Sequence, residues 1–309
     1  MRIKTKLKLN KVAFTAYLII AWINLGPINA TGYGTAGARI LNLDSCARIN
    51  ARGNAHAGLA DDINSLVYNP AGLINIKKYE FQFTRMNHFL NTGGNAAACA
   101  ALIGKTGIGF KLKLFSAKDT YRDSRGYNRK TFSINYTQYT FGIGHMLNTA
   151  HSIGISADIV TENYGLKTIE EYGKDKTGMS ISYNAGWLYK KTKKDSFGLT
   201  VKNLGKGFEV NNKESDLPLK YTLGSSHKRG KFLFVCELFT GNEFQFGWQC
   251  GLQADLNRFE IRSGMVYITN PVLSLGFGLP LGNWALDYAF CPHFDLGAAH
   301  RLSLGVSFR

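Results

Sequence analysis

The sequence has little charge, little proline and no paired cysteine motif. Charged residues make up only 19% of the 309 residues, whereas about 25% is usual in a soluble domain. Six prolines are too few for proline-rich linkers, and an apolar share of 45% excludes a disordered chain. The sequence therefore predicts a folded protein of one or two domains.

The cysteines and histidines show no spacing typical of a disulfide framework or a zinc site. The cysteines are odd in number and include no C-x-x-C pair, and no histidine belongs to an H-E-x-x-H motif. We interpret the cysteines as small apolar side chains and predict neither a metal nor a cofactor. The cysteines are Cys46, Cys99, Cys236, Cys250 and Cys291.

The first thirty residues have the composition of a secretory signal peptide. Five positively charged residues precede an uncharged apolar stretch from Val12 to Trp22, and the segment ends on the small residue Ala30. That stretch is shorter than the roughly 20 residues of a membrane-spanning helix, and a short N-terminal anchor is the alternative. Removal of the five charges would lower the formal net charge from +16 to +11.

Alternation of apolar and polar residues begins near Lys77 and continues to the end of the chain. From Phe244 to Leu256, every even position is apolar, and every odd position is Gln, Gly or Asp. A period of two is typical of a strand with one apolar face and one polar face. No later stretch holds 18 consecutive apolar residues, so a mature chain that enters a membrane must cross it without helices.

The alternating segments number about fourteen, and short connections interleave with longer ones. An even number of strands of about ten residues, joined alternately by tight turns and long loops, is typical of an outer-membrane β-barrel. A soluble β-sandwich or a secreted barrel with a dry core is the competing structure. The expected strands cover residues 78–88, 95–104, 107–117, 130–146, 151–163, 178–190, 196–203, 218–228, 231–239, 244–255, 258–267, 272–281, 283–291 and 300–308.

Closure of the sheet satisfies the backbone polar groups in lipid, where no water can pair with them. The apolar faces would then contact lipid, and the polar faces would line the lumen. We expect eight aromatic side chains in the outward band and its interfacial girdles. They are Tyr79, Phe81, Tyr183, Trp187, Tyr189, Trp248, Trp284 and Tyr288.

Residues 31–76 do not alternate, and we predict that they form a plug inside the barrel of residues 77–309. A short helix should end near Asn69, because the residue before Pro70 disfavours the helical conformation. Asp61 or Asp62 is the predicted N-cap. The expected fold is an all-β transmembrane antiparallel barrel with a plug that contains a short helix, because a fourteen-stranded lumen is too wide for wall side chains to fill.

The plug segment and the last two strands resemble a known family. Gly58–Asp62, Tyr68 and Asn69–Leu73 resemble the N-terminal signature of the PorV/PorQ family, within the FadL-like outer-membrane barrels. Leu286–Phe290 and His300–Gly305 are similar to that family's C-terminal strands. The chain departs from the pattern at residues 51–55, which are less rich in Gly and Met, and at its end, where Arg309 follows Phe308.

The resemblance implies a non-enzymatic protein of the bacterial outer membrane, with two branches of function. FadL-like relatives admit hydrophobic small molecules through a plugged barrel, whereas PorV-like relatives serve type IX secretion and handle exported proteins. A structural or adhesive surface role is a further alternative. The resemblance implies plug-motif roles for Asp61, Asp62, Asn69, Pro70 and Ala71, for which a purely structural turn is the competing interpretation.

Three other signals compete with this interpretation and are weaker. Gly32–Gly37 matches G-x-G-x-x-G but follows no strand, so it lacks the context of a dinucleotide site. Ser226 and His227 favour, at most, an outer-membrane lipid hydrolase, because no G-x-S-x-G motif surrounds a serine. A basic, Tyr-containing stretch near residues 118–130 is compatible with nucleic acid, which an exported protein would not meet. The net positive charge favours contact with outer-membrane lipids and lipopolysaccharide, or simple solvation of loops and lumen.

Overall fold

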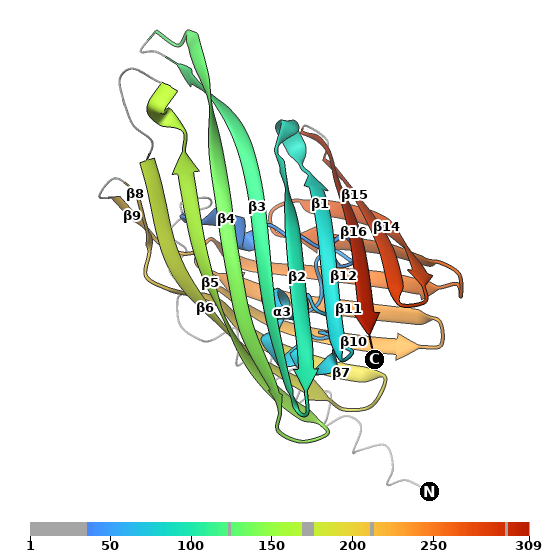
Figure 1. The fold of residues 1–309 in the computed structure, drawn as a ribbon. Coiled ribbons are helices and arrows are strands. Elements are labelled where there is room, and N and C mark those ends of the chain that lie inside the picture. The colour runs from blue at the N-terminus through green and yellow to red at the C-terminus, as the bar shows by residue number, and fades with distance from the viewer. Residues whose placement is uncertain (1–35, 123–124, 169–175, 211–212, 294–295, 309) are drawn as a thin grey trace, which may run out of the picture.

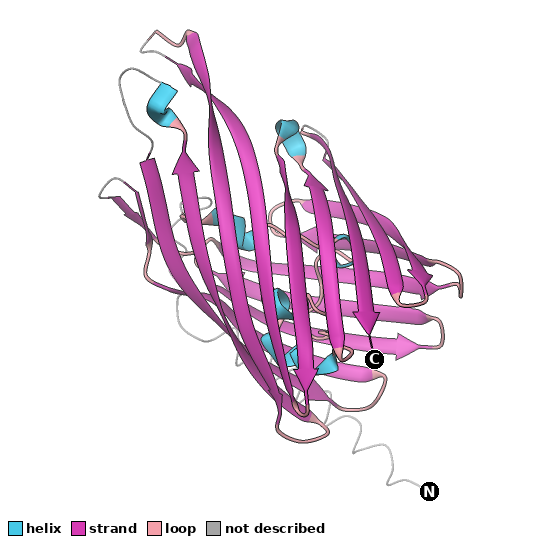
Figure 2. Ribbon diagram, viewed as in Figure 1, coloured by secondary structure: helices cyan, strands magenta, loops and turns pink. Residues whose placement is uncertain are grey.

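The computed structural model describes residues 36–122, 125–168, 176–210, 213–293 and 296–308. Within these residues, fourteen strands form a closed antiparallel barrel in which β1 pairs with both β2 and β16 (Figures 1 and 2). The predicted all-β barrel is therefore confirmed. The barrel strands are β1 Tyr79–Asn87, β2 Gly93–Ile103, β3 Thr106–Arg122, β4 Asn128–Met146, β5 His151–Tyr164, β6 Lys176–Lys190, β7 Asp195–Gly205, β10 Lys220–Arg229, β11 Phe232–Gly241, β12 Phe244–Asp255, β13 Glu260–Tyr267, β14 Pro271–Leu281, β15 Trp284–His293 and β16 Gly297–Phe308.

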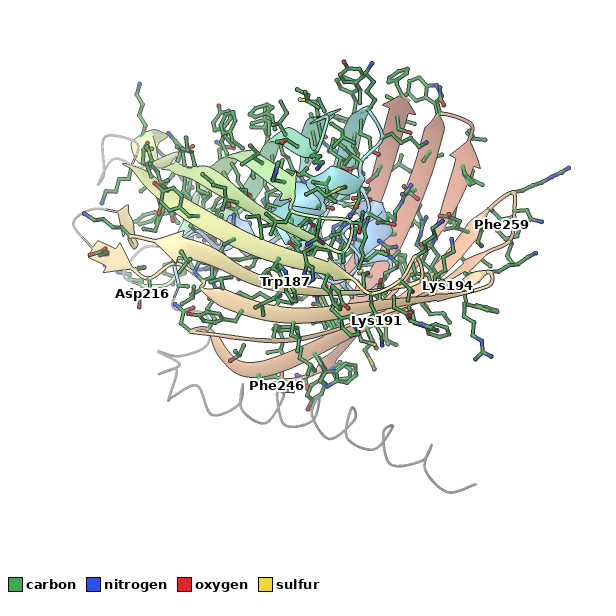
Figure 3. All side chains as sticks on the ribbon, turned by 90° about the horizontal axis from the view of Figure 1, so that it is seen from below. Trp187, Lys191, Lys194, Asp216, Phe246 and Phe259 are labelled. Atoms are coloured by element: carbon green, nitrogen blue, oxygen red, sulfur yellow. The ribbon has the colours of Figure 1, made fainter. Side chains whose placement is uncertain are left out.

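The barrel strands carry apolar side chains outward and polar side chains inward. On β5, Ile155 is 62% exposed, whereas the neighbouring Ser156 and Asp158 are buried. Phe246 points away from the barrel in Figure 3 and is 50% exposed. Five of the aromatic side chains predicted to face outward are exposed: Tyr79, Phe81, Tyr183, Trp187 and Trp284. This arrangement places an apolar band on the outside of a polar lumen, as lipid requires.

The two ends of the barrel differ. Six connections lie at one end of the barrel, which is called the short-turn end here and spans the bottom and right-hand side of Figure 1. They are the β2–β3, β4–β5, β6–β7, β10–β11, β12–β13 and β14–β15 connections. The opposite end, called the long-loop end, carries the longest connections and the tall extension of β3 and β4. Two short connections among the described residues lie at the long-loop end: Asn242–Glu243 between β11 and β12, and Ile268–Asn270 between β13 and β14. The predicted alternation of tight turns and long loops was therefore wrong at these two positions.

Short helical elements precede the barrel and lie inside it (Figure 2). They are η1 Arg39–Asn42, α2 Ala47–Asn50, α3 Ser65–Tyr68 and η2 Pro70–Asn75. We call residues 36–76 the inner segment. Two further turns, η3 Phe89–Asn91 and η4 Leu166–Thr168, lie in long-loop connections. In the described part of the chain, no helix has the length and apolar composition needed to cross a membrane.

Three local features differ from the sequence-based expectation. β3 and β4 continue through residues that the alternation placed in a loop, because polar strand residues beyond the apolar band look like loop residues in a sequence. A small hairpin, β8 Phe208–Val210 and β9 Lys213–Ser215, was not expected. The N-cap of α3 is Asn64 rather than Asp61 or Asp62, although the Asp62 carboxylate accepts a 2.8 Å hydrogen bond from the Asn64 backbone N–H. The predicted helix end at Asn69 agrees with the C-cap of α3.

The connection between β7 and β10 folds over the long-loop end of the lumen. Phe208 is buried and packs with Ile40, Leu41 and Val160. The backbone N–H of Gly37 donates to the carbonyl of Asp216 at 2.9 Å. These contacts tie the beginning of the inner segment to an outer loop, so this part of the barrel mouth is covered.

Candidate functional site: an inner segment between two chambers

The inner segment approaches the wall on every one of the fourteen barrel strands. The η2 helix packs against β2 to β6, and α2 packs against β14, β15 and β16. The intervening residues meet the remaining strands: residues 57–58 meet β7 and β10, the backbone of His56 meets Glu237 on β11, residues 52–53 meet β12 and β13, and Ile63 meets Glu80 on β1. The inner segment therefore forms a layer across the lumen.

Glycines on the inner face of the wall allow the backbone of the inner segment to approach closely. A Cβ atom on Gly198 would lie 1.9 Å from the Ala57 carbonyl oxygen, and one on Gly264 would lie 2.0 Å from the Gly53 nitrogen. Any larger side chain there would displace backbone rather than a flexible side chain. Further glycines of this kind are Gly107, Gly144, Gly154, Gly224 and Gly251.

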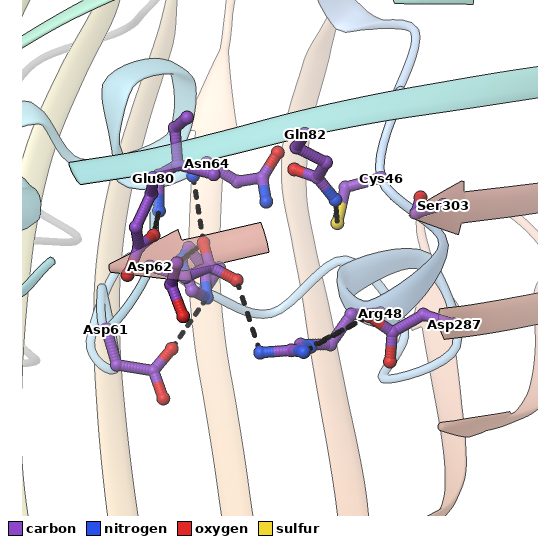
Figure 4. Close-up of polar contacts among 12 residues, drawn as sticks. Cys46, Arg48, Asp61, Asp62, Asn64, Glu80, Gln82, Asp287 and Ser303 are labelled. Atoms are coloured by element: carbon purple, nitrogen blue, oxygen red, sulfur yellow. Dashed lines mark hydrogen bonds and ion pairs between the residues drawn. The ribbon is translucent and has the colours of Figure 1, made fainter. Parts of the chain in front are cut away.

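Toward β12–β15, charged side chains hold the inner segment to the wall (Figure 4). Arg48 of α2 lies between two carboxylates: its Nη2 is 3.1 Å from Asp287 Oδ2 on β15, and its Nη1 is 3.9 Å from Asp62 Oδ2. The other oxygen of Asp287 accepts from Arg262 Nη1 of β13 at 2.7 Å, and Arg262 also pairs with Glu260. Asp287 therefore bridges one arginine of the inner segment and one of the wall. Both members of such a buried pair must stay together, since a lone buried charge is costly.

Two more polar contacts extend this side of the interface. Arg52 Nη1 donates to Gln253 Oε1 at 3.3 Å, and the same oxygen accepts from Arg262 Nε at 2.9 Å. The buried carboxylate of Glu237 on β11 accepts from the backbone N–H groups of His56 and Ala57. Glu237 thus accepts from two backbone N–H groups that no helix of the inner segment satisfies, and it holds this turn against the wall.

Toward β2–β6 the interface is mainly apolar. Two lysines are exceptions: Lys113 of β3 donates to the carbonyls of Ile40 and Leu43, and Lys190 of β6 donates to Asn75. Leu66 and Leu73 are fully buried with Ala100 of β2, and Ala71 packs with Leu188 of β6. Pro70 lies against Gly154, where a Cβ would come within 2.3 Å of its carbonyl carbon. No ionised side chain among the described residues takes part in these clusters.

The predicted motif residues fall into two groups. Asn69, Pro70 and Ala71 are buried together at the β5–β6 wall, where Asn69 Nδ2 donates to the carbonyls of Ala57 at 2.7 Å and Trp187 at 3.2 Å. Asn69 Oδ1 accepts from the Ala71 N–H at 3.2 Å. Asn69 therefore joins two turns of the inner segment to β6. The assignment of these residues as a plug motif remains a prediction.

Asp61 and Asp62 lie beside His56 at the short-turn face of the inner segment. His56 Nε2 is 3.3 Å from Asp62 Oδ1, and His56 Nδ1 is 4.0 Å from Asp61 Oδ1. These three residues bring ligand atoms close enough for a cation, but Arg48 and Arg52 already supply positive charge to them. Burial by itself would raise the pKa of Asp62, and the nearby His56, Arg48 and Arg52 lower it below its usual range. We interpret the group as an ion-pair cluster.

A chamber of about 570 Å³ lies on the long-loop side of the inner segment. We call it the upper chamber. Its lining combines apolar side chains with Lys202, Lys220, Asp44 and Glu237. Tyr68 forms part of its floor, and its hydroxyl donates to the Asp44 carboxylate. The apolar lining residues include Leu41, Leu43, Val67, Phe239, Val266 and Ile268.

A second chamber, of about 910 Å³, lies on the short-turn side, and we call it the lower chamber. Arg52, Leu59 and Asp61 of the inner segment line it, together with the β6–β7 and β10–β11 turns. Residues of the inner segment thus line both chambers from opposite sides.

The most important anchors were not identified from sequence. Arg48, Glu237 and Asp287 lie in segments where single charged residues have no motif, and only the fold brings Arg48 and Asp287 together across 239 residues. The Ser226–His227 dipeptide does not form a catalytic pair, since Ser226 contacts Ser196 inside the barrel, whereas His227 pairs with Asp195 at the rim. Residues 32–35 of the glycine motif and the predicted signal peptide, residues 1–30, lie outside the described residues.

Several proteins of known structure share this architecture. A FadL homologue of Pseudomonas aeruginosa aligns with a TM-score of 0.63 over 86% of this chain and 98% of its own, at 12% identity. The chain has the fold of FadL-like barrels. The toluene transporter TodX of P. putida gives a TM-score of 0.60 at 12% identity, over 91% of this chain and 99% of its own. The monoaromatic hydrocarbon channel CymD gives a TM-score of 0.60 at 12% identity, over 90% of this chain and 99% of its own.

At these identities, the likeness establishes the fold alone. No protein-family model and no curated protein matches the sequence. A closed barrel with an apolar outer band is typical of an outer-membrane protein. Its neighbours in structure are channels rather than enzymes.

Proposed function

We propose that this protein carries small hydrophobic or amphipathic compounds across the bacterial outer membrane. The observation that carries the proposal is the closed layer formed by the inner segment, with a partly apolar upper chamber on one side of it. A compound would enter the upper chamber, and a movement of the inner segment would admit it to the lower chamber. The size of the upper chamber suits a small molecule.

The proposal includes an orientation and a mature form. In outer-membrane barrels the tight turns face the periplasm, so the upper chamber would open toward the outside. Residues 1–30 would be removed as a signal peptide, and residues 31–76 would act as the plug of the barrel formed by residues 77–309. The apolar outer band would contact membrane lipids, and contact of exposed cations with lipopolysaccharide is a further part of the prediction.

The secretion role implied by the PorV/PorQ resemblance is the second candidate. A chamber of about 570 Å³ is too small for a folded exported protein to pass, so such a role would use the outer surface of the barrel rather than its lumen. Periplasmic retention of exported proteins after gene deletion would favour this candidate over small-molecule transport.

A pair of tryptophan substitutions on one strand tests the transport proposal. Val266 lines the upper chamber, whereas Met265, its neighbour on β13, belongs to the other face of the strand. Uptake of a radiolabelled monoaromatic compound into proteoliposomes should fall strongly in Val266→Trp and remain near the wild-type rate in Met265→Trp. Equal rates in all three proteins, no faster than in empty liposomes, would remove the proposal.

A further inference from the structure

The lower chamber has a strong excess of positive charge. Six lysines line it, contributed by two turns that are neighbours because β7 pairs with β10. Lys191 and Lys194 of the β6–β7 turn are labelled in Figure 3. The six are Lys190, Lys191, Lys193, Lys194, Lys228 and Lys231, and all are exposed to solvent.

Most of these lysines have no partner in the described part of the chain. Lys190 donates to Asn75 Oδ1 of the inner segment. For the ammonium groups of the other five, the described residues provide no hydrogen bond or ion pair. The chamber therefore presents five exposed ammonium groups, without a hydrogen bond or ion pair to the described residues, toward the short-turn end.

The acidic residues of the chamber do not balance this charge. Glu260 pairs with Arg262, and Asp195 accepts from His227 and Thr192. Arg48 and Arg52 of the inner segment add two more cations to the lining, where their charges are shared with Asp62, Asp287 and Gln253. Asp195 keeps its negative charge and also interacts with Lys191. Among the described lining residues, Asp61, Asp195 and Asp255 thus oppose the five lysines.

The position of the lysines favours a soluble partner over a lipid surface. Lys228 and Lys231 line the chamber, whereas Arg229, which lies between them in sequence, does not. Arg229 pairs in register with the exposed Phe232 and therefore belongs to the outer face of the wall. A lipid headgroup beside the wall would therefore contact Arg229 before it contacted the chamber lysines.

We propose that the lower chamber receives an acidic polypeptide segment of a partner on the short-turn side. One phosphate or carboxylate would engage one or two of the ammonium groups, but an extended acidic segment of about ten residues spans roughly 33 Å and can contact lysines of both turns together. Several exposed charge pairs give modest binding and fast, salt-sensitive association. The partner would be periplasmic if the proposed orientation holds, but the binding itself does not depend on the transport role.

The experiment uses the full chain in nanodiscs of phosphatidylcholine and a fluorescent peptide of about ten glutamates. The chamber variant carries Lys191→Gln, Lys193→Gln, Lys194→Gln and Lys228→Gln. The matched control carries Lys78→Gln, Lys105→Gln, Arg229→Gln and Arg258→Gln, which remove the same charge from exposed cations at the same end but outside the chamber.

Wild type and control should bind the peptide with affinities within about twofold of each other, and the chamber variant should bind at least about tenfold more weakly. Binding should weaken as salt rises and be absent for a polyglutamine peptide of equal length. Equal losses in the two variants, or no binding of polyglutamate to the wild type, would overturn the proposal. So would competition by millimolar inorganic phosphate that is as strong as that by the peptide, or binding seen only with phosphatidylglycerol vesicles.

Discussion

The two sides of the inner segment are held to the barrel by different physical means. Toward β2–β6, Leu66, Leu73 and Pro70 pack against apolar side chains and glycines. Toward β11–β16, Arg48 and Arg52 pair with wall residues such as Asp287. Separation on the first side would expose apolar surface to water, whereas separation on the second would let charged groups become hydrated in the chambers. We therefore expect the charged side to open first.

A single reporter can compare the two sides. Cys46 adjoins α2, and its thiol is fully buried, so a water-soluble maleimide can label it only when the inner segment opens. Burial also raises the pKa of this thiol. The measurements below assume a protein in which the other four cysteines are replaced by alanine.

The largest effect should come from Asp287→Asn. This change leaves Arg48 and Arg262 partly uncompensated, and loss of one partner of a buried ion pair costs about 3–5 kcal/mol. Labelling of Cys46 should accelerate about a hundredfold or more. Asp255→Asn, next to the exposed β12–β13 turn, serves as the control and should change the rate little. An unchanged rate in Asp287→Asn would mean that the ion pairs do not hold α2.

Leu66→Ala should destabilise the protein about as much as Asp287→Asn or slightly less. It should accelerate the labelling of Cys46 less than Asp287→Asn does. The change removes a fully buried side chain from the apolar side and should cost about 2–5 kcal/mol. Thermal unfolding of the whole protein, followed by gel mobility, should shift to lower temperature. Labelling of Cys46 should rise less than in Asp287→Asn, and a larger rise would reverse the proposed order of opening.

Gly154→Val tests the close approach of the backbone at Pro70. The added Cβ would lie 2.3–2.6 Å from three backbone atoms of Pro70 and Ala71, and overpacking of this kind costs about 1–3 kcal/mol. Gly305→Val is the matched control, because the nearest atom to its Cβ lies at 3.8 Å. Tryptic cleavage within the inner segment should increase in Gly154→Val alone. Equal cleavage of the two variants would count against a tight contact.

The smallest expected effect is a pH dependence that arises from Asp62. Its pKa is lowered in the folded state, so its ionised form stabilises the inner segment above the ordinary carboxyl pKa of about 4, and this contribution decreases as the pH falls below that value. The open probability of channels in a planar bilayer should rise between about pH 4 and pH 3. In Asp62→Asn this particular rise should be absent; its persistence would assign the effect to other groups.

The sequence predicted the barrel well because lipid and lumen impose opposite demands on alternate residues. Pro70 likewise predicted the helix end at Asn69, a purely local effect. The wall glycines could not be recognised as contacts of the inner segment, since Gly198 and Gly264 look like any small residue on a polar strand face. The pairing of Arg48 with Asp287 depends on closure of the whole barrel and has no local signal. The extension of β3 and β4 was not predicted, because beyond the apolar band lipid no longer imposes an alternating pattern on the strand.

The most direct test of the closed inner segment is the ion conductance of the full wild-type chain in a planar bilayer at neutral pH. Because the segment approaches all fourteen strands, insertion events should produce little or no steady current, with only brief openings. Asp287→Asn should lengthen those openings. A steady, large conductance in the wild type, equal to that of the Asp287→Asn variant, would show that the lumen is open and would contradict the account.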